Sequence, residues 1–253
     1  MKHNHALVVL SGGQDSVTCL AWAANRFRHI SAITFDYGQR HRVELECAER
    51  AVEYLARSSG RVPGVSFSLP RVVNASALKS VGQSALTSTI AEPVSAPHRD
   101  NPTVPASFVP GRNALFLTLA YVHALSIGAD AVVTGVCQTD FSGYPDCRVN
   151  FVMALQTALE IGYLPPGRAR VPLLTPLMYL DKAQTFALAK REGALDLVLE
   201  VSHTCYEGDH TTRHPWGYGC GVCPACKLRS DGFRRFEAGQ YNMELLDNQG
   251  EAA

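Results

Sequence analysis

Hydrophobic and polar positions follow two alternating patterns in the first part of the chain. Short continuous apolar runs at 6–10, 30–35 and 65–69 are typical of strands buried on both faces of a parallel sheet. Between them, 15–27 and 43–57 carry apolar side chains at helical spacing. Strands that alternate with helices predict an α/β protein with a Rossmann-like open parallel sheet, right-handed crossovers and helices on both faces.

The pattern weakens and then returns along the rest of the chain. Residues 79–105 are rich in Ser, Thr and Pro, and so long a loop inside a compact domain is either functional or mobile. Beyond this loop the spacing predicts helices at 114–127, 151–161 and 182–192 and a strand at 131–136.

The composition narrows the class of protein. The chain has 253 residues, of which 46% are hydrophobic and 18% charged, so it can bury a sizeable core. Lys and Arg together equal Asp and Glu at 23 each, so we expect a small-molecule substrate and no direct binding of nucleic acid. No apolar run reaches membrane-spanning length, and Met1 to His5 leave no room for a signal peptide before the first strand. The cysteines do not follow the pattern of a small disulfide scaffold, which favours a reducing cytoplasm.

A glycine-containing loop, SGGQDS at 11–16, joins the first strand to the first helix. Ligands bind at this edge of an open parallel sheet, and Gly12 and Gly13 let backbone N–H groups converge on an anion at the helix N-terminus. Ser11 and Ser16 add hydroxyl donors, and Asp15 is a candidate to hold Mg²⁺ against phosphate oxygens.

This loop differs from two better-known phosphate-binding loops, because it has neither a Walker A lysine nor the third glycine of a dinucleotide fingerprint. It matches SGGxDS, the pyrophosphate-binding PP-loop of enzymes that split ATP into AMP and pyrophosphate. The alternative is an ordinary strand-to-helix turn capped by Ser or Asp, which binds nothing. The strand before the loop, the Asp-Ser pair and the helix beyond it favour the PP-loop.

Four cysteines gather near the C-terminus, where 201–239 also carries a short basic helix. Tight CxxC turns place two thiolates on one metal ion, and two further thiols complete a closed structural Zn²⁺ site. The predicted ligands are Cys205, Cys220, Cys223 and Cys226. The alternatives to a four-cysteine zinc site are a thioredoxin-type dithiol, inert buried thiols, or a ligand set that includes a histidine. The histidines close enough to compete are His203, His210 and His214.

Further stretches resemble the 7-cyano-7-deazaguanine synthases, a family of PP-loop enzymes of the queuosine pathway. They are FDYGQRH at 35–41, FVPGRN at 108–113, DFSGYPDCR at 140–148 and the C-terminal CGVCPAC followed by KLR. The resemblance spans 7 to about 236. It is weaker in 83–101, which is divergent, and in 205–220, which is longer than is usual in the family.

The resemblance implies an adenine nucleotide alpha hydrolase-like fold and a ligase reaction. The family converts 7-carboxy-7-deazaguanine, ammonia and ATP with Mg²⁺ into the nitrile. Adenylation turns a carboxylate oxygen into a leaving group, ammonia then forms the amide, and a second adenylation allows dehydration. One pocket must therefore accept acid and amide alike. The resemblance also implies a homodimer. No glutaminase-like segment is visible in the sequence, so we expect free ammonia as the nitrogen donor.

Each motif supplies candidate site residues. The nucleotide is expected to contact Leu10, Ser11, Gly12, Gly13, Gln14, Asp15, Ser16, Asp36, Tyr37 and Gly38. Arg112 and Arg148 are candidates to hold phosphate or carboxylate in bidentate geometry, beside Ser11, Asp15 and Ser16 as catalytic residues. Asp140 or Asp146 is a candidate for the guanine-like edge, and Tyr37 or Tyr144 for ring stacking. Cys147 is expected to be a packing residue.

These features give an expected division of the chain and two competing functions. We expect a nucleotide-binding catalytic domain at 1–200, a zinc-binding segment at 201–240 packed on it, and a flexible tail at 241–253. The nearest alternative is a tRNA-modifying PP-loop enzyme, which would need a basic face and usually an added RNA-binding domain. A zinc-dependent binding module without catalysis would leave SGGQDS unexplained.

Overall fold

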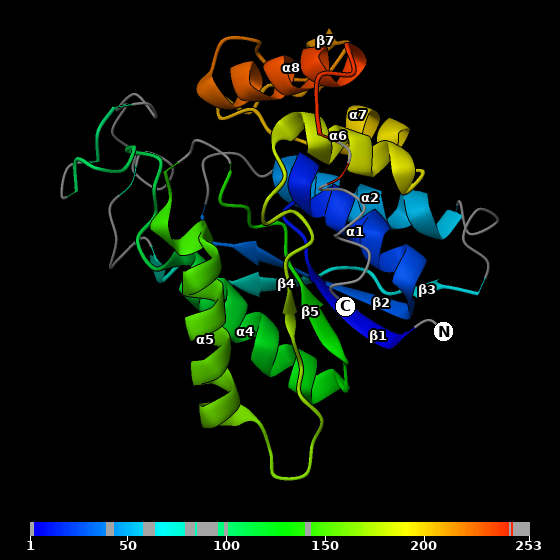
Figure 1. The fold of residues 1–253 in the computed structure, drawn as a ribbon, viewed down its shortest axis with the longest axis vertical. Helices are drawn as coiled ribbons and strands as arrows, with labels where there is room; N and C mark the ends of the chain where they lie inside the picture. The colour runs from blue at the N-terminus through cyan, green and yellow to red at the C-terminus, as the bar shows by residue number, and fades with distance from the viewer. Residues whose placement is uncertain are drawn as a thin grey trace.

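A computed structural model describes residues 3–38, 43–57, 64–78, 84, 96–98, 101–139, 143–242 and 244 (Figure 1). Strands and helices alternate through most of the described residues, and the last helix of this order is α8. In chain order the elements are β1 (His3–Val9), α1 (Gln14–Arg26), β2 (Phe27–Asp36), α2 (Val43–Arg57), β3 (Ser66–Phe67), β4 (Arg71–Asn74), α4 (Arg112–Ile127), β5 (Ala131–Val133), the 3-10 helix η1 (Pro145–Cys147), α5 (Val149–Tyr163), β6 (Leu173–Leu174), α6 (Lys182–Arg191), α7 (Leu195–Val201), β7 (Arg213–His214), β8 (Gly217–Tyr218) and α8 (Pro224–Glu237).

The main sheet is parallel, as the alternation of strands and helices predicts. Its strands lie in the order β3-β2-β1-β5-β6, and β4 also pairs with β2. The central strand β1 pairs with β2 on one side and with β5 on the other, so Ala6 lies between Ile30 and Ala131. The carboxyl ends of β1, β2 and β5 therefore meet at one edge of the sheet, where the loops that follow them converge.

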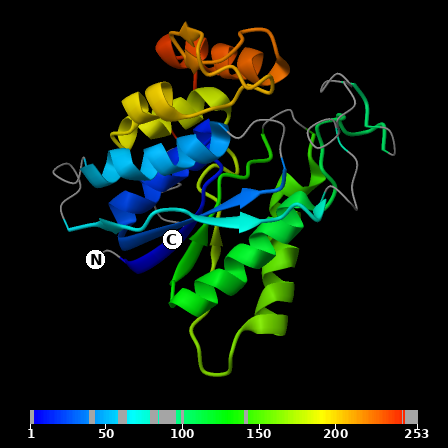
Figure 2. The same ribbon diagram turned by 180° about the vertical axis from the view of Figure 1, so that it is seen from behind.

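Helices cover both faces of this sheet, and a hydrophobic core lies under each layer (Figures 1 and 2). Side chains on β1 alternate between the two cores, as the period of a strand requires. Val8 packs with the core beneath α1 and α2, whereas Leu7 packs with the core beneath α4 and α5. The prediction of an open parallel sheet with helices on both faces is confirmed.

The C-terminal segment adds a further layer outside α1 and α2. Helix α8 lies against α6, where Phe233 meets Phe186 edge to face with ring centroids 5.2 Å apart. The short antiparallel pair β7–β8 precedes α8. Three of the clustered cysteines, Cys205, Cys223 and Cys226, belong to the same core as β1 and α1.

Some elements differ from the predictions. The predicted strand at 65–69 is shorter, at Ser66–Phe67, and β4 follows within a stretch with no buried side chain. Sequence patterns detect burial, so an edge strand held by backbone pairing to β2 alone leaves little signal. The two-residue strand β6 and the helix α7 also lie outside the predicted elements.

Candidate nucleotide site and metal centre

The loop at 11–16 connects the end of β1 to α1, and its backbone is packed against α2. Gly12 has a positive φ of 83°, and a Cβ built on it would lie 2.2 Å from the carbonyl oxygen of Glu44. Only glycine allows both this backbone conformation and this close approach. The backbone N–H of His203 donates to the carbonyl oxygen of Gly12 at 2.8 Å, so the C-terminal part of the chain also holds the loop.

Hydrogen bonds between its two serines close the loop on itself. The Ser11 N–H donates to Ser16 Oγ at 3.2 Å, and the two hydroxyl oxygens lie 3.1 Å apart. The Ser16 hydroxyl also donates to the carbonyl oxygen of Gly13 at 3.1 Å. These bonds hold the hydroxyl groups at the entrance of α1, beside the backbone N–H groups of its first turn.

The first turn of α1 has the properties of an anion-binding site. Its N-cap residue is Gly13, and no side chain caps the helix there. The helix dipole and the free N–H groups of a first turn favour a phosphate at this position. Gly135 lies at the end of β5 so close to this turn that an added Cβ would be 3.0 Å from the backbone nitrogen of Ser16.

Lys182, in the first turn of α6, is a site residue that the sequence analysis missed. Its Nζ lies 2.6 Å from Oδ2 of Asp15, and its side chain is only 7% exposed. A buried ammonium group beside a phosphate-binding loop is suited to hold negative charge. Lys182 and Asp15 are 167 residues apart in the chain, so no local motif connects them.

A cavity of about 320 Å³ opens at the carboxyl edge of the sheet. This volume lies at the lower end of the range for small-molecule sites. Its walls come from the loop at 11–16, the ends of β2 and β5, the first turns of α2 and α4, and the C-terminal segment. The residues that bring charge or a phenol to the cavity are Asp15, Tyr37, Glu44, Arg112, Tyr144, Lys182 and Tyr206.

Arg112 lies between two aromatic rings in this cavity. Its guanidinium carbon is 6.0 Å from the ring centroid of Tyr37 and 5.8 Å from that of Tyr144. Burial alone would lower the pKa of Arg112, but the nearby phenols and Asp146 outweigh it and raise the pKa above its ordinary value. Arg112 therefore stays charged, and its first-turn position on α4 aims a cation at the cavity.

Glu44 is a second site residue that the sequence analysis missed. Burial raises the pKa of its carboxyl to about 7, although Arg112 acts in the opposite direction. Burial also raises the pKa of Tyr37 to about 12, with Glu44 adding to the shift. The sequence feature that could have identified Glu44 as a candidate is its place in the first turn of an amphipathic helix, directly after the 35–41 motif.

The structure brings most of the predicted nucleotide residues together. Within the loop, Leu10, Ser11, Gly13, Gln14, Asp15 and Ser16 line the cavity, as does Tyr37. Gly12 instead packs on α2. Asp36 and Gly38 lie outside the cavity wall, where Asp36 Oδ1 accepts a hydrogen bond from the Gly38 N–H at 3.0 Å.

Only some of the residues predicted to bind the substrate line the cavity. Tyr144 lines the cavity, and its hydroxyl donates to Ser107 at 2.8 Å. Asp146 is buried behind the wall, where it accepts a hydrogen bond from the backbone N–H of Asn113 at 3.3 Å. Arg148 is exposed and is not part of the wall. Asp140 lies outside the described residues, as does most of the divergent 83–101 stretch.

Cys147 lies at the cavity wall as well as packing beside Tyr144. Its sulfur accepts a hydrogen bond from Nδ2 of Asn113 at 3.2 Å. It also belongs to a small apolar cluster with Phe108 and Tyr144.

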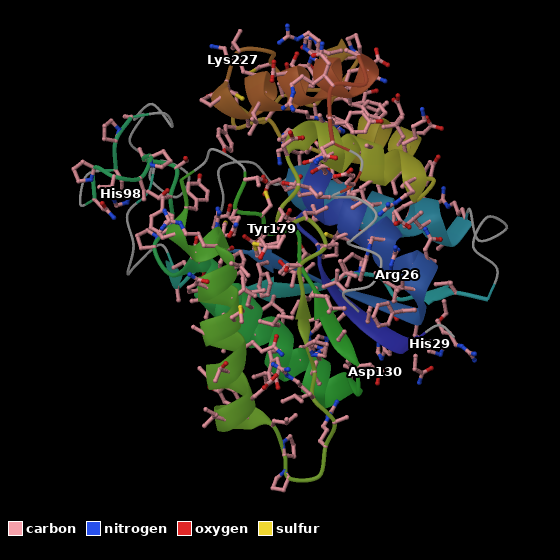
Figure 3. The ribbon with its side chains drawn as sticks, in the orientation of Figure 1. Arg26, His29, His98, Asp130, Tyr179 and Lys227 are labelled. Atoms are coloured by element: carbon pink, nitrogen blue, oxygen red, sulfur yellow. The ribbon has the colours of Figure 1, made fainter. Side chains whose placement is uncertain are left out.

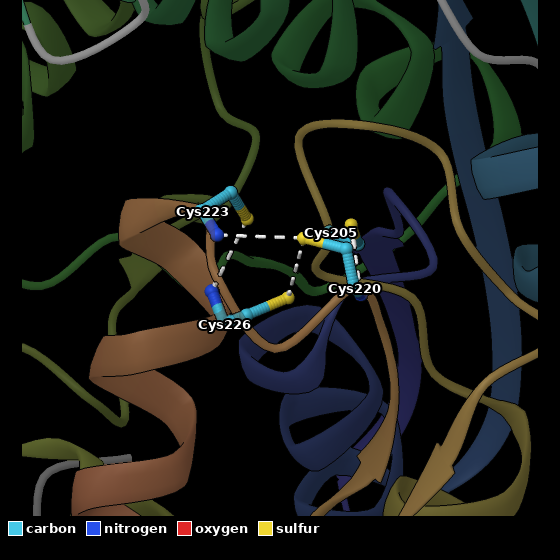
Figure 4. Close-up of side chains that lie close together, drawn as sticks. All are labelled: Cys205, Cys220, Cys223 and Cys226. Atoms are coloured by element: carbon cyan, nitrogen blue, oxygen red, sulfur yellow. Dashed lines mark hydrogen bonds between the residues drawn. The ribbon is translucent and has the colours of Figure 1, made fainter.

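The four clustered cysteines converge on one point (Figure 4). The sulfurs of Cys205, Cys220, Cys223 and Cys226 all lie within 4.8 Å of one another. Four thiolates about 2.3 Å from a central Zn²⁺ have sulfurs roughly 4 Å apart, so this set fits a tetrahedral ion. Backbone N–H groups support the arrangement, since Cys223 donates to the sulfur of Cys220 and Cys226 to that of Cys223, each at 3.4 Å.

Hydrogen bonds couple the thiols of the cluster. Hydrogen bonding from Cys226 lowers the pKa of Cys223, whereas the same interaction raises the pKa of Cys226 and burial raises that of Cys205. Metal ions bind cysteine as the thiolate, so a bound ion would displace the thiol protons. The cluster could hold one metal ion, with all four ligands supplied by the protein.

The nearby histidines make other contacts. His203 is buried, and its Nε2 lies 2.9 Å from the carbonyl oxygen of Cys205 while its Nδ1 lies 3.2 Å from that of His210. The Nε2 of His214 lies 2.9 Å from the carbonyl oxygen of Gly219, and its ring stacks on Trp216. Among the described residues, the metal-ligand cluster consists of the four cysteines alone.

Arg229 fastens the cysteine segment to the rest of the protein. Its side chain is fully buried on α8 and donates to the backbone carbonyls of Trp216 at 2.8 Å and Val198 at 2.9 Å. A further bond reaches the hydroxyl of Thr204 at 2.9 Å. Because Thr204 lines the cavity, the anchor of the metal centre also supports one wall of the candidate site.

The opposite edge of the sheet has different surroundings. Figure 3 shows His29 and Asp130 near the amino ends of the strands, while Lys227 lies on α8 at the other end of the molecule.

Among the described residues, no helix has both the length and the apolar character needed to span a bilayer.

A parallel sheet with helices on both faces and a glycine-containing anion loop at its carboxyl edge defines a PP-loop protein of the adenine nucleotide alpha hydrolase-like class. A solved structure with this fold is that of a 4-thiouridine synthetase in complex with RNA and bound ATP. The TM-score is 0.50 at 18% identity, over 96% of this chain and 53% of that chain. This chain therefore spans about half the length of that protein, and the likeness shows the fold alone.

The family model described as "Queuosine biosynthesis protein QueC" matches residues 5–237, and the chain belongs to this family. Among curated relatives, the 7-cyano-7-deazaguanine synthase of Wolinella succinogenes is 47% identical over 94% of this chain and 96% of its own length. That of Granulibacter bethesdensis is 49% identical over 93% of both chains. That of Helicobacter pylori is 41% identical over 94% of this chain and 98% of its own. The resemblance stated from the sequence motifs is confirmed.

Proposed function

We propose that this protein is a 7-cyano-7-deazaguanine synthase that converts 7-carboxy-7-deazaguanine and ammonia into the nitrile at the expense of ATP. The observation that carries the proposal is the cavity at the carboxyl edge of the sheet, which joins the loop at 11–16 to Lys182 and Arg112 in a chain of the QueC family. A carboxylate is a poor electrophile, and a site that binds pyrophosphate can activate it by adenylation.

The loop and Lys182 would hold the phosphates of ATP. The uncapped first turn of α1 and the hydroxyl groups of Ser11 and Ser16 offer hydrogen-bond donors in a fixed arrangement. Lys182 would neutralise charge that develops on the departing pyrophosphate. Asp15 is the carboxylate that would hold Mg²⁺, and the ion would withdraw negative charge from the phosphates.

Arg112 and the two tyrosines beside it would bind the deazapurine. A guanidinium group between Tyr37 and Tyr144 can pair with the carboxylate of the substrate while a ring stacks on either phenol. Asp140 and Asp146 remain our candidates for the guanine-like edge. Arg148 is a weaker candidate for catalysis because its side chain is exposed.

We assign the cysteine cluster to structural Zn²⁺. Four cysteines would complete its coordination sphere, which leaves no position for substrate and gives the ion a structural role. We further propose the division of the chain at about residue 200, a homodimer in the cytoplasm, and free ammonia as the nitrogen donor. A tRNA-modifying activity is not favoured, because the equal numbers of basic and acidic residues provide no overall positive field.

The test is to incubate zinc-loaded protein with 7-carboxy-7-deazaguanine, MgATP and ammonium and to follow the products by mass spectrometry. We expect the nitrile, AMP and pyrophosphate, and the ratio of AMP to nitrile gives the ATP stoichiometry. Omission of ammonium is the control, which should stop the reaction before the amide. Formation of AMP with a different acid only would keep the adenylation chemistry and refute the substrate. Absence of ATP cleavage with every acid tested would refute the proposal entirely.

A further inference from the structure

Gln14 is buried at the wall of the cavity with its carboxamide unsatisfied. Its side chain is 2% exposed, and it lines the cavity. Among the described residues, neither its Nε2 nor its Oε1 has a hydrogen-bond partner. A buried amide without partners destabilises a folded protein, so a ligand with complementary groups is the expected partner.

Gln14 is the first residue of α1, at the start of the helix that follows the candidate phosphate loop. It lies between Gly13 and Asp15 in the loop that would hold the phosphates. On α1, positions 14, 18, 21 and 25 share a face. Asn25 at the far end of this face donates to Glu192 at 2.6 Å, so the face is directed toward the outer helical layer. On that side the cavity wall is formed by Thr204, Tyr206, Ala225 and Leu228.

The reaction proposed above changes the hydrogen-bonding character of its substrate midway. In the first adenylation, one carboxylate oxygen attacks the α-phosphorus and pyrophosphate leaves with the electron pair of the broken P–O bond. The other carboxylate oxygen is a hydrogen-bond acceptor. Ammonia then displaces AMP and loses one proton to water, which gives the amide.

In the second adenylation the amide oxygen attacks, and pyrophosphate leaves again. The nitrogen now occupies the position of the second oxygen and donates through N–H. It loses one proton to water as the adenylated imidate forms. It loses the other as AMP leaves with the electron pair of the C–O bond, which gives the C≡N group. One point of the cavity must therefore face first an acceptor and then a donor.

A carboxamide can answer both demands, and that of Gln14 is the one at the cavity wall whose polar atoms have no partner among the described residues. It carries N–H donors and a carbonyl acceptor, and a half-turn about its last bond exchanges them at low cost. Lys182 and Arg112 can only donate, and an ionised carboxylate can only accept. We propose, on the basis of the function proposed above, that Gln14 recognises the group under activation, donating to the acid in the first adenylation and accepting from the amide in the second.

The experiment compares Gln14→Glu and Gln14→Met with the wild-type protein in two separate assays at pH 8. One assay measures pyrophosphate release from MgATP with 7-carboxy-7-deazaguanine, and the other measures it with the corresponding amide. A glutamate keeps the acceptor and removes the donor. We therefore expect the ratio of acid-dependent to amide-dependent rate to fall about 10- to 100-fold in Gln14→Glu. The use of a ratio cancels any effect of the new charge on ATP binding.

Gln14→Met keeps the length of the side chain and removes both polar functions. We expect both rates to fall by a similar factor of about 10, while the thermal midpoint stays equal to or above that of the wild type because an unsatisfied amide is removed. Wild-type rates in Gln14→Met, or an equal loss of both rates in Gln14→Glu, would overturn the role of Gln14 and leave the proposed function intact. If the wild-type protein cleaves ATP with neither compound, both proposals fail.

Discussion

Substitution of Gly12 by alanine tests whether the contact between the loop and α2 sets the geometry of the site. The added Cβ would lie 2.2 Å from the carbonyl oxygen of Glu44 and 2.9 Å from the backbone nitrogen of Ala48. Ordinary contact begins at 3.4 Å, so the loop and the helix would have to separate by about 1 Å. Both neighbours are backbone atoms, which cannot move aside as a flexible side chain can.

Two effects follow from this geometry. The positive φ of 83° costs an alanine about 1–2 kcal/mol. A displacement of about 1 Å at a catalytic loop lowers a rate about 100-fold. We therefore expect Gly12→Ala to lose about two orders of magnitude in ATP cleavage and to melt several degrees lower than the wild-type protein.

Gly128→Ala is the matched control. Gly128 ends α4 with a φ of 70°, and a Cβ added there meets nothing within 4 Å. It carries the same backbone penalty without the contact, so it should lower the thermal midpoint by about 2–8 °C and leave the rate of AMP formation near that of the wild type. If Gly12→Ala matches Gly128→Ala in both rate and midpoint, the close packing of loop against α2 has no role in catalysis and our reasoning is wrong.

Three further predictions concern charge, pH and metal. Lys182→Met should lower the rate of pyrophosphate release about 100- to 1000-fold, because a donor to developing charge is removed. Steady-state kinetics check this against Lys190→Met, an exposed position on the same helix, and equal rates in both variants would refute it. Burial raises the pKa of the Glu44 carboxyl to about 7, so the folded protein favours its neutral form. The stability that this preference contributes is fully present at low pH and is lost as the pH rises toward 7 and the carboxyl ionises. Denaturant unfolding should show Glu44→Gln gaining up to about 3 kcal/mol over the wild type between pH 5 and 8, and a gain independent of pH would contradict the burial of this carboxyl. Cys226→Ser should bind far less zinc by metal analysis and unfold at a lower temperature, whereas Cys147→Ser should retain the metal, and full zinc content in Cys226→Ser would exclude the four-cysteine site.

The loop, the helices on both faces and the cysteine cluster were predictable because their signals are local. A buried strand followed by SGGQDS and an amphipathic helix specifies an anion site within a few residues. Likewise, the spacing of Cys220, Cys223 and Cys226 predicts a cluster able to hold a metal through two tight turns. The family resemblance rested on similar short motifs, and it was confirmed over nearly the whole chain.

Other features depended on contacts between distant parts of the chain. Lys182 reaches Asp15 across 167 residues, and its own surroundings in the sequence look like an ordinary helix start. Arg148 belongs to the same motif as Tyr144, yet it is exposed whereas Tyr144 lines the cavity. The direction of a side chain depends on how η1 packs behind the wall, which a motif does not record.

The sequence by itself therefore determined the fold class, the candidate phosphate loop and the cysteine cluster that could hold a metal, since each follows largely from hydrophobic period or short spacing. Only the tertiary structure decided which side chains share one cavity. Burial of Glu44, the pairing of Lys182 and the unsatisfied carboxamide of Gln14 arise where β1, α2, α6 and the C-terminal segment meet. Such contacts form only once the sheet has brought distant residues together, and no local pattern encodes them.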